Sequence, residues 1–271
     1  EITGSYSRRI WFFYEWLTEQ ILPIEDVKSG NYVDALNEKL QFGCAKSKVS
    51  RQRVNNNLPG VNGFCPLIRK TEKLVQYIDE RLNNKAAQYI GDIHGDLLAR
   101  AAAFLLLSDS KASYTIEGET PPHNRIERWG KIIGQAGAQP LSVDEIERLQ
   151  EVVIPDGRFI LPGIRCVGGF IGEHDRVSNI PIPEHISAKP EDLDTLLDAY
   201  LNSYRLMIES GYHPVLAAAT IAFSFVFIHP LEDGNGRIHR YLIHHVLAEC
   251  GFTPKGVVFP VSAVILKRIE E

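Results

Sequence analysis

The sequence predicts a mainly α-helical protein with one small β element, and three observations lead to this fold class. Several segments along the chain have apolar side chains that recur every three or four positions. Capping residues or prolines precede several of these segments, and a glycine follows the last. The chain also lacks the alternation of strands and helices that builds a parallel sheet. Its length allows one large domain or two small ones.

The first expected helix covers residues 8–21, and a change of composition follows it. Four basic residues, a run of three asparagines and a Pro-Gly pair lie between Gly43 and Pro66, which is the composition of a loop. This stretch indicates a joint between an N-terminal helical lobe and the rest of the chain. We expect its basic side chains to be solvated, because no aromatic residues interleave them. The apolar face of the first helix would consist of Ile10, Phe13, Tyr14, Leu17 and Ile21.

Helices are expected along most of the remaining chain. Residues 71–83 are periodic, and the Ala/Leu-rich residues 97–108 follow Asp96, a candidate N-cap. A capping box at Ser142 opens residues 146–153. Pro190 and Pro214 suit the first position of a helix, and Gly251 suits its end. The last three expected helices are residues 191–209, 215–227 and 236–250.

Residues 158–183 differ from the rest because they are rich in glycine and β-branched residues. This composition predicts a hairpin or an extended flap.

The two ends of the chain have a different character. The final residues, 267–271, resemble a helix interior, and the chain begins at Glu1 without an initiator Met. We therefore expect the native protein to continue beyond the printed sequence.

Composition and charge exclude several classes of protein. The formal charge is −5 and the pI is about 6.0, which disfavours binding of nucleic acid or an anionic membrane over the whole surface. The four cysteines form no Cys-x-x-Cys pair, so neither a disulfide framework nor a zinc ribbon is expected. The longest apolar run, residues 217–228, is shorter than the roughly 20 residues that span a bilayer. We expect a cytoplasmic protein with reduced thiols.

The segment from His229 to Arg240 carries the chemistry. Gly234, Asn235 and Gly236 open a helix, where backbone N–H groups form an anion site suited to phosphate. Arg237 and Arg240 lie three residues apart on one face of that helix and would bind further phosphate oxygens. Asp233 is placed to hold Mg²⁺ between two phosphates. His229 is a candidate general base at neutral pH.

This segment resembles the Fic motif, His-x-Phe-x-[Asp/Glu]-Gly-Asn-[Gly/Lys]-Arg-x-x-Arg, and departs from it only at Leu231, where the family usually has Phe. A weaker resemblance extends from about Ala86 to Phe259. The resemblance to the Fic family implies a Fic-type helical core with a β-hairpin flap and protein AMP-transferase activity. His229 would deprotonate a Ser, Thr or Tyr hydroxyl that attacks the α-phosphate of ATP. Asp233 would hold Mg²⁺, residues 234–236 would form the anion hole, and Arg237 and Arg240 would contact phosphates.

A second motif of the family matches upstream. Ser113, Glu117 and Gly118 fit the inhibitory pattern [Ser/Thr]-x-x-x-Glu-[Gly/Asn], in the position that characterises the N-terminally autoinhibited subclass. The resemblance implies an inhibitory helix at about residues 108–118. Its glutamate would pair with Arg240, place negative charge where the γ-phosphate belongs, and misalign the α-phosphate for attack.

The resemblance also implies a domain plan and partners. Residues 1–85 would form an N-terminal helical region with a loop, and residues 86–271 the Fic catalytic domain. The flap would bind the target backbone by strand addition, with Gly169, Phe170 and Ile171 as candidates. The expected partners are ATP and a hydroxyl-bearing protein, which includes the chain itself, while membrane and nucleic acid are not expected. A homodimer is left open.

Two alternatives remain beside AMP transfer. Relatives on the same scaffold transfer other phosphate-containing groups or remove AMP, and removal also uses a glutamate at the inhibitory position. Relatives that transfer phosphate carry Lys for the second motif glycine, whereas this chain has Gly236. The other alternative is a regulatory binding module whose DNA-binding helix-turn-helix lies outside this chain.

Overall fold

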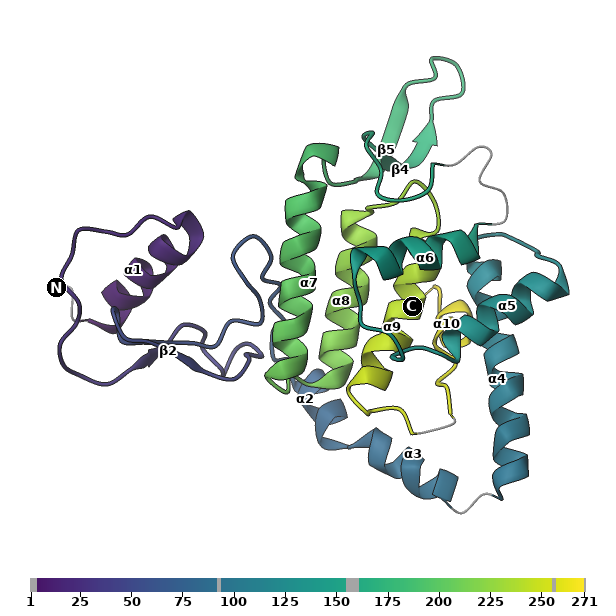
Figure 1. Ribbon diagram of the computed structural model, residues 1–271, viewed down its shortest axis with the longest axis horizontal. Helices are drawn as coiled ribbons and strands as arrows, with labels where there is room; N and C mark the ends of the chain where they lie inside the picture. The colour runs from purple at the N-terminus through teal and green to yellow at the C-terminus, as the bar shows by residue number, and fades with distance from the viewer. Residues whose placement is uncertain (1–3, 92–93, 155–160, 255–256, 271) are drawn as a thin grey trace. The chain divides into compact units, whose positions relative to one another are not determined.

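The structure is a computed structural model, and it describes residues 4–91, 94–154, 161–254 and 257–270 (Figure 1). The chain divides into two compact units. The first unit consists of residues 1–80 and 198–217, and the second consists of residues 81–197 and 218–271. The predicted boundary at residues 85/86 remains a prediction, since it concerns the extent of the catalytic domain rather than compactness.

The first unit contains a small sheet beside its helices. Helix α1 (Ser5–Thr18) contacts β1 (Val33–Asp34) and β3 (Val54–Asn56), and β2 (Ser47–Val49) completes a sheet of order β1-β3-β2. The β1 and β3 strands are parallel, whereas β2 and β3 are antiparallel. The predicted loop between Gly43 and Pro66 therefore includes two strands. A cluster around α1 forms the core of this unit: Phe12, Ala35, Leu36, Val54 and Leu58.

The predicted apolar face of α1 is wrong except at Phe13, which packs against the core. Ile10 and Leu17 are 63% and 60% exposed, while Trp11 and Phe12 are buried. Only one side of the helix meets the short strands, and the bulky aromatic residues occupy that side. Helix α2 (Glu72–Asp79) follows, with the Thr71 hydroxyl accepting a hydrogen bond from Leu74 N–H at its start.

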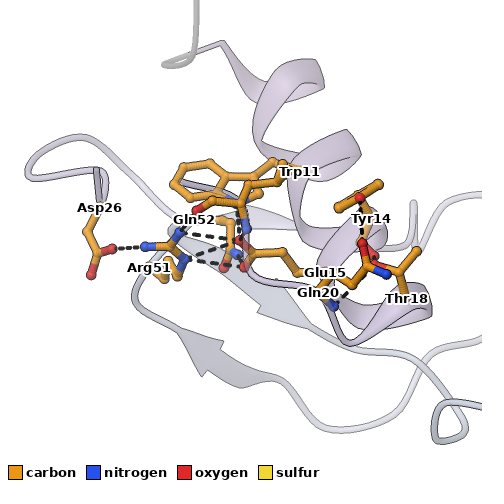
Figure 2. A network of polar contacts seen from close by, with 9 residues as sticks. Trp11, Tyr14, Glu15, Thr18, Gln20, Asp26, Arg51 and Gln52 are labelled. Carbon is orange, nitrogen blue, oxygen red and sulfur yellow. Dashed lines mark hydrogen bonds and ion pairs between the residues drawn. The ribbon is translucent and has the colours of Figure 1, made fainter. Parts of the chain in front are cut away.

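A polar network joins α1 to the loops of the first unit (Figure 2). Glu15 accepts hydrogen bonds from the indole of Trp11 at 2.7 Å, the backbone N–H of Leu22 at 2.9 Å, and the side chain of Gln52. The guanidinium of Arg51 approaches the same carboxylate at 3.3 Å and also contacts Asp26. These donors hold the pKa of Glu15 below its usual value although burial opposes them.

Several helices of the second unit pack against α9, which buries most of its side chains. Helices α4, α5, α6 and α10 all contact α9 within the second unit. Aromatic and aliphatic side chains such as Tyr114, Trp129, Ile146 and Leu149 fill the space between them. The elements are α3 (Leu82–Gly91), α4 (Gly95–Ile116), α5 (His123–Ile133), α6 (Val143–Val153), η1 (Pro190–Asp192), α7 (Leu193–Glu209), α8 (Pro214–Ile228), α9 (Asn235–Glu249) and α10 (Val261–Lys267).

Helix starts agree with the sequence prediction at some positions and differ at others. Ser142 caps α6 by accepting a hydrogen bond from Glu145 N–H at 3.1 Å, as predicted. His94, not Asp96, is the N-cap of α4, and Asp96 lies in its first turn. Pro190 opens the short η1 rather than α7 itself. Helix α10 ends at Lys267, so the described residues after it are not a helix interior.

The predicted flap is present as an antiparallel hairpin. Strand β4 (Phe170–His174) pairs with β5 (Pro181–Ile186), with a register shift between Ile171 and Gly172. Residues 158–160 of the predicted stretch lie outside the described residues. The structure is thus mainly helical with the hairpin that was predicted, and the first unit adds a small sheet that was not predicted. None of the helices it describes has both the length and the apolar character needed to cross a bilayer.

Candidate active site

His229 lies immediately after α8, in a strained backbone conformation. Its φ is +55°, a left-handed value that costs a non-glycine residue about 1–2 kcal/mol. Its N–H donates to Phe225 O at 2.9 Å, and its Nδ1 lies 3.3 Å from Val226 O. If Nδ1 carries the proton, as this contact favours, Nε2 is left as the acceptor.

Burial lowers the pKa of His229, and the backbone contact with Val226 opposes this shift. The positive charge of Arg165 and the nearby His185 lower the pKa further, whereas Glu117 raises it. The net effect favours the neutral imidazole near pH 7, which is the form a general base requires.

The loop after His229 is closed by Asn235. The side-chain amide of Asn235 donates to Leu231 O at 2.7 Å, and its carbonyl oxygen accepts from Leu231 N–H at 3.1 Å. Asn235 is buried, so its side chain is occupied in holding the loop rather than directed at a ligand. Leu231, where the Fic motif usually has Phe, is fully buried and packs inward.

The N-terminus of α9 forms an anion site. Gly234 precedes the helix with φ +92°, and the first intrahelical hydrogen bond runs from Ile238 N–H to Gly234 O at 3.0 Å. The N–H groups of Asn235, Gly236 and Arg237 lie in the first turn, where a helix offers them no carbonyl partner and a negatively charged group can bind, whereas the N–H of Gly234 donates to Asp233 Oδ1. A carboxylate lies at this position: Glu117 Oε1 would be only 2.2 Å from a Cβ placed on Gly236.

The predicted contact between Glu117 and Arg240 is present. Arg240 donates to Glu117 Oε1 at 2.8 Å, and its other hydrogen bonds go to Ser113 Oγ at 3.0 Å and Ser113 O at 2.8 Å. Arg240 is 5% exposed, so this guanidinium is almost fully desolvated. Gly118 follows with φ +73°, the left-handed conformation that ends α4 beside the glutamate. Ser113 and Glu117 of the predicted inhibitory motif thus contact Arg240 of α9, and Gly118 follows directly after them.

A second acidic residue, which the sequence reasoning did not identify, lies beside the first. Glu119 Oε1 is 2.9 Å from Arg237 NH1, and its other oxygen is 3.3 Å from Arg125 NH2. The guanidinium groups of Arg125 and Arg237 lie over the ring of Tyr114, at 5.0 and 5.3 Å. Both arginines predicted to bind phosphate are consequently paired with carboxylates in this structure.

Helix α4 is attached to α9 at three successive levels. Asp109, Ser113 and Glu117 are spaced by four residues, so they share one face of the helix. Ser113 and Glu117 meet the first half of α9 through Arg240, and Asp109 lies 3.0 Å from His244 Nε2 one turn further on. Asp109 also accepts from Ala263 N–H at 3.0 Å and Ser262 Oγ at 3.2 Å in α10. This network, in which Asp109 and His244 were not predicted, fixes the axis of α4.

Asp233 fits one part of a magnesium site. Its Oδ1 accepts from Gly234 N–H at 2.6 Å and lies 3.5 Å from Arg237 NH2, while its side chain is 43% exposed. Among the residues that the structure describes, no cluster of three His, Cys, Asp or Glu side chains surrounds it. One carboxylate is what a magnesium ion needs from the protein when nucleotide phosphates and water provide the other oxygens.

The candidate flap residues lie at the start of β4. Phe170 is paired with Ile186 and Ile171 with His185, and Ser187 N–H donates to Gly169 O at 3.1 Å. Ile171 is 41% exposed and Ile186 is 73% exposed. Apolar side chains on a solvent-facing hairpin suit a binding surface. The hairpin is anchored at its base by a buried arginine, Arg165, which the sequence reasoning also missed.

Comparison with known proteins finds a family model that part of the chain matches. Residues 140–247 match the model of the Fic/DOC family. A protein adenylyltransferase Fic from Nematostella vectensis is 35% identical over 80 residues, which cover 29% of this chain and 18% of that protein. The protein of the same description from Drosophila virilis is 33% identical over 139 residues, covering 50% of this chain and 28% of that protein. The matches therefore span less than a third of these relatives.

A solved structure supports the same fold. The crystal structure of a Fic domain containing signaling protein from Bacteroides thetaiotaomicron superposes with a TM-score of 0.53. The superposition covers 70% of this chain and 78% of that chain, at 20% sequence identity. At this identity the likeness concerns the fold alone.

Proposed function

From the match of residues 140–247 to the model of the Fic/DOC family, we propose that the chain is an autoinhibited protein AMP-transferase. It would move AMP from ATP to a hydroxyl group of a protein and release pyrophosphate. The observation that carries this proposal is the convergence of His229, the N-terminus of α9 and two arginines around a place now held by carboxylates.

The triphosphate of ATP would replace those carboxylates. The free N–H groups at the start of α9 suit phosphate oxygens, because the helix dipole is positive there. Arg237 and Arg240 would exchange Glu119 and Glu117 for phosphate oxygens, which accept the same charge-assisted hydrogen bonds. The family resemblance assigns the γ-phosphate to Arg240.

His229 would act as the general base. The target hydroxyl would give its proton to His229 Nε2 while its oxygen forms a bond to the α-phosphorus. The bond between that phosphorus and the bridging oxygen would break, and pyrophosphate would leave with the electron pair. Asn235 would support this step indirectly, since it fixes the loop that joins His229 to the anion site.

Asp233 would hold Mg²⁺ together with the nucleotide. When bound, the ion would neutralise charge on the phosphates and on the leaving pyrophosphate. Asp233 is oriented for this by the hydrogen bond from Gly234 N–H, which leaves a large part of its carboxylate open to solvent.

Autoinhibition would arise from charge replacement. Glu117 occupies the α9 terminus and Arg240 with a carboxylate, so a nucleotide must displace it to be aligned for attack. Glu119 would act in the same direction at Arg237. The target would add its backbone to the flap at Gly169, Phe170 and Ile171.

The test uses the purified chain, Mg²⁺ and ATP labelled on either the α- or the γ-phosphate. We expect the Glu117→Gly variant to transfer α-label to itself or to an added protein, well above the unaltered chain, and His229→Ala in the same background to abolish it. Transfer of γ-label would instead indicate phosphate transfer. Absence of both labels, together with release of AMP from a modified protein by the unaltered chain, would indicate AMP removal.

A further inference from the structure

We propose that Arg165 is a positioning residue, which holds the His229 backbone and both ends of the flap in one arrangement. The inference rests on the proposed function, because His229 needs positioning only if it acts on a substrate. Arg165 lies before the flap, outside the segment from His229 to Arg240 and outside the inhibitory motif.

The guanidinium of Arg165 binds three carbonyl groups from three segments. Its Nε donates to His229 O at 2.7 Å, its NH1 donates to Val167 O at 2.7 Å, and its NH2 donates to Ala188 O. The planar guanidinium has donors in a fixed fork, so the directions of these three carbonyls are set together. The backbone of the same residue donates to Pro230 O at 3.0 Å, which makes a further link to the loop after His229.

His229 requires this support because its backbone is in an unfavourable conformation. A non-glycine residue stays at φ +55° only where its surroundings hold it there. The Arg165 Nε hydrogen bond fixes the carbonyl on one side of His229, and the N–H bond to Phe225 O fixes the other. The two contacts fix the backbone position from which the imidazole side chain extends. A displacement of about 1 Å at a reacting group can lower a rate by about 10²-fold.

The same guanidinium couples the flap to the base. Ala188 N–H donates to Ile228 O at 3.2 Å, and His185 Nε2 lies 2.8 Å from Phe227 O. The hairpin is therefore attached to the last turn of α8, directly before His229. These contacts and Arg165 would therefore fix the position of a target strand bound to β4 relative to the general base.

The charge of Arg165 also argues for a role beyond stability. Arg165 is 5% exposed, and among the described residues its polar partners are neutral carbonyls rather than a carboxylate. Burying an unpaired cation is costly, so a residue selected for stability alone would be better replaced by an apolar one. The positive charge also favours the neutral form of His229.

The test compares Arg165→Met and Arg165→Lys in the Glu117→Gly background. Arg128→Met is the matched control, because Arg128 also donates to a backbone carbonyl, Val152 O at 2.9 Å, but is exposed. We expect Arg165→Met to lower kcat by about 10²-fold with KM for ATP changed less than about twofold. Arg165→Lys, which keeps the charge and one direction of donation, should recover part of kcat. The control should keep both constants.

A pH profile separates positioning from a general loss of structure. The charged or titratable groups that influence His229 are Arg165, His185 on β5 and Glu117 at the end of α4, and the last is absent in this background. Removing the Arg165 charge should raise the pKa of His229, so the midpoint of the acid limb of kcat should move to higher pH in Arg165→Met but not in Arg165→Lys. Unchanged kcat and midpoint in Arg165→Met would overturn the proposal.

The outcome for Arg165 is distinguishable from failure of the proposed function. If the Glu117→Gly parent transfers no AMP, the proposed function fails, and the imidazole of His229 is then titrated by NMR in the same variants. Amide hydrogen exchange at Ser187 and Ala188 is measured beside it. A higher His229 pKa and faster exchange in Arg165→Met would support the link, and no change in either would contradict it. If Arg165→Met fails to fold, Arg165→Lys with full kcat would contradict it as well.

Discussion

The two units each hold a glutamate against an arginine, but the two carboxylates are surrounded in different ways. In the first unit, Glu15 is bound by an indole, a backbone N–H and an amide in addition to Arg51 (Figure 2). In the second unit, Glu117 accepts a hydrogen bond from Arg240 and lies beside Gly236 in the first turn of α9. Glu15 is 13% exposed and Glu117 is 30% exposed, measured on the side chains.

The different surroundings of Glu15 and Glu117 indicate which of the two ion pairs a ligand can replace. The donors around Glu15 come from four separate positions, and only a side chain rooted in α1 reaches all of them. The groups around Glu117 are a helix terminus and a guanidinium, which are the two commonest protein partners of phosphate. The same pair of residue types therefore stabilises the fold in one unit and, on the proposed function, would form a replaceable inhibitory contact in the other.

The largest expected effect is on kcat/KM for ATP, and it should distinguish Arg240 from Arg51. In the Glu117→Gly background, Arg240→Ala should lower kcat/KM for ATP by about 10²-fold, because a desolvated charge-assisted contact to phosphate is lost. Arg51→Ala should leave kcat/KM within about twofold of the parent. Steady-state kinetics with labelled ATP gives both values, and equal losses in the two variants would remove the distinction.

Removing the carboxylate of Glu15 tests whether its ion pair stabilises the fold. Glu15→Ala should lower the free energy of unfolding by about 2–3 kcal/mol, since buried donors on Trp11 and Leu22 lose their acceptor. Chemical denaturation followed by tryptophan fluorescence measures it, with Glu25→Ala as the exposed control. AMP transfer per folded molecule should not rise. Activation comparable to that of Glu117→Gly would show that the Glu15 pair is also inhibitory.

Acid should affect the two regions in different ranges of pH. Because burial lowers the pKa of His229, transfer by the Glu117→Gly variant should be flat near pH 7–8 and fall about tenfold per unit only below about pH 6.5. The pKa of Glu15 is also lowered, so its contribution to stability is complete above its unfolded value near pH 4.3 and is lost as the pH falls further. A kcat midpoint above pH 7 would contradict the first expectation.

The smallest effect concerns Glu119. In the Glu117→Gly background, Glu119→Ala should lower KM for ATP by about two- to threefold, the size expected for a partly exposed ion pair. Glu127→Ala is the control, because this carboxylate is exposed on α5 and pairs with His123. An unchanged KM would mean that Arg237 is free to bind phosphate despite Glu119.

The predictability of the site follows from sequence distance. His229 to Arg240 is a single turn and the start of one helix, so residue spacing alone places the base, the anion site and both arginines. The contact of Glu117 with Arg240 was predicted through the family resemblance, although the two are 123 positions apart. Arg165, Glu119 and Asp109 meet the site through tertiary contacts that no local period marks.

The elements of the fold also differ in how well the sequence predicts them. Long amphipathic helices such as α6 and α9 were predicted because caps and periodicity agree in them. The sheet of the first unit was missed, since strands of two or three residues are too short to show alternation and asparagines within them indicate loops. The face of α1 was misassigned because its core side is chosen by those same strands.

The three-level attachment of α4 to α9 has a consequence for how inhibition is relieved. Asp109 is fully buried and tied to both α9 and α10, whereas Glu117 flanks the last turn of α4 and is followed by a left-handed glycine. Helix ends fray at far lower free energy than helix interiors detach. On the proposed function, nucleotide would therefore compete with the unwinding of the terminal turn of α4, not with the undocking of the helix. Activation by this route would leave the scaffold of the second unit in place, and its cost would be set by the local stability of the few residues after Ser113.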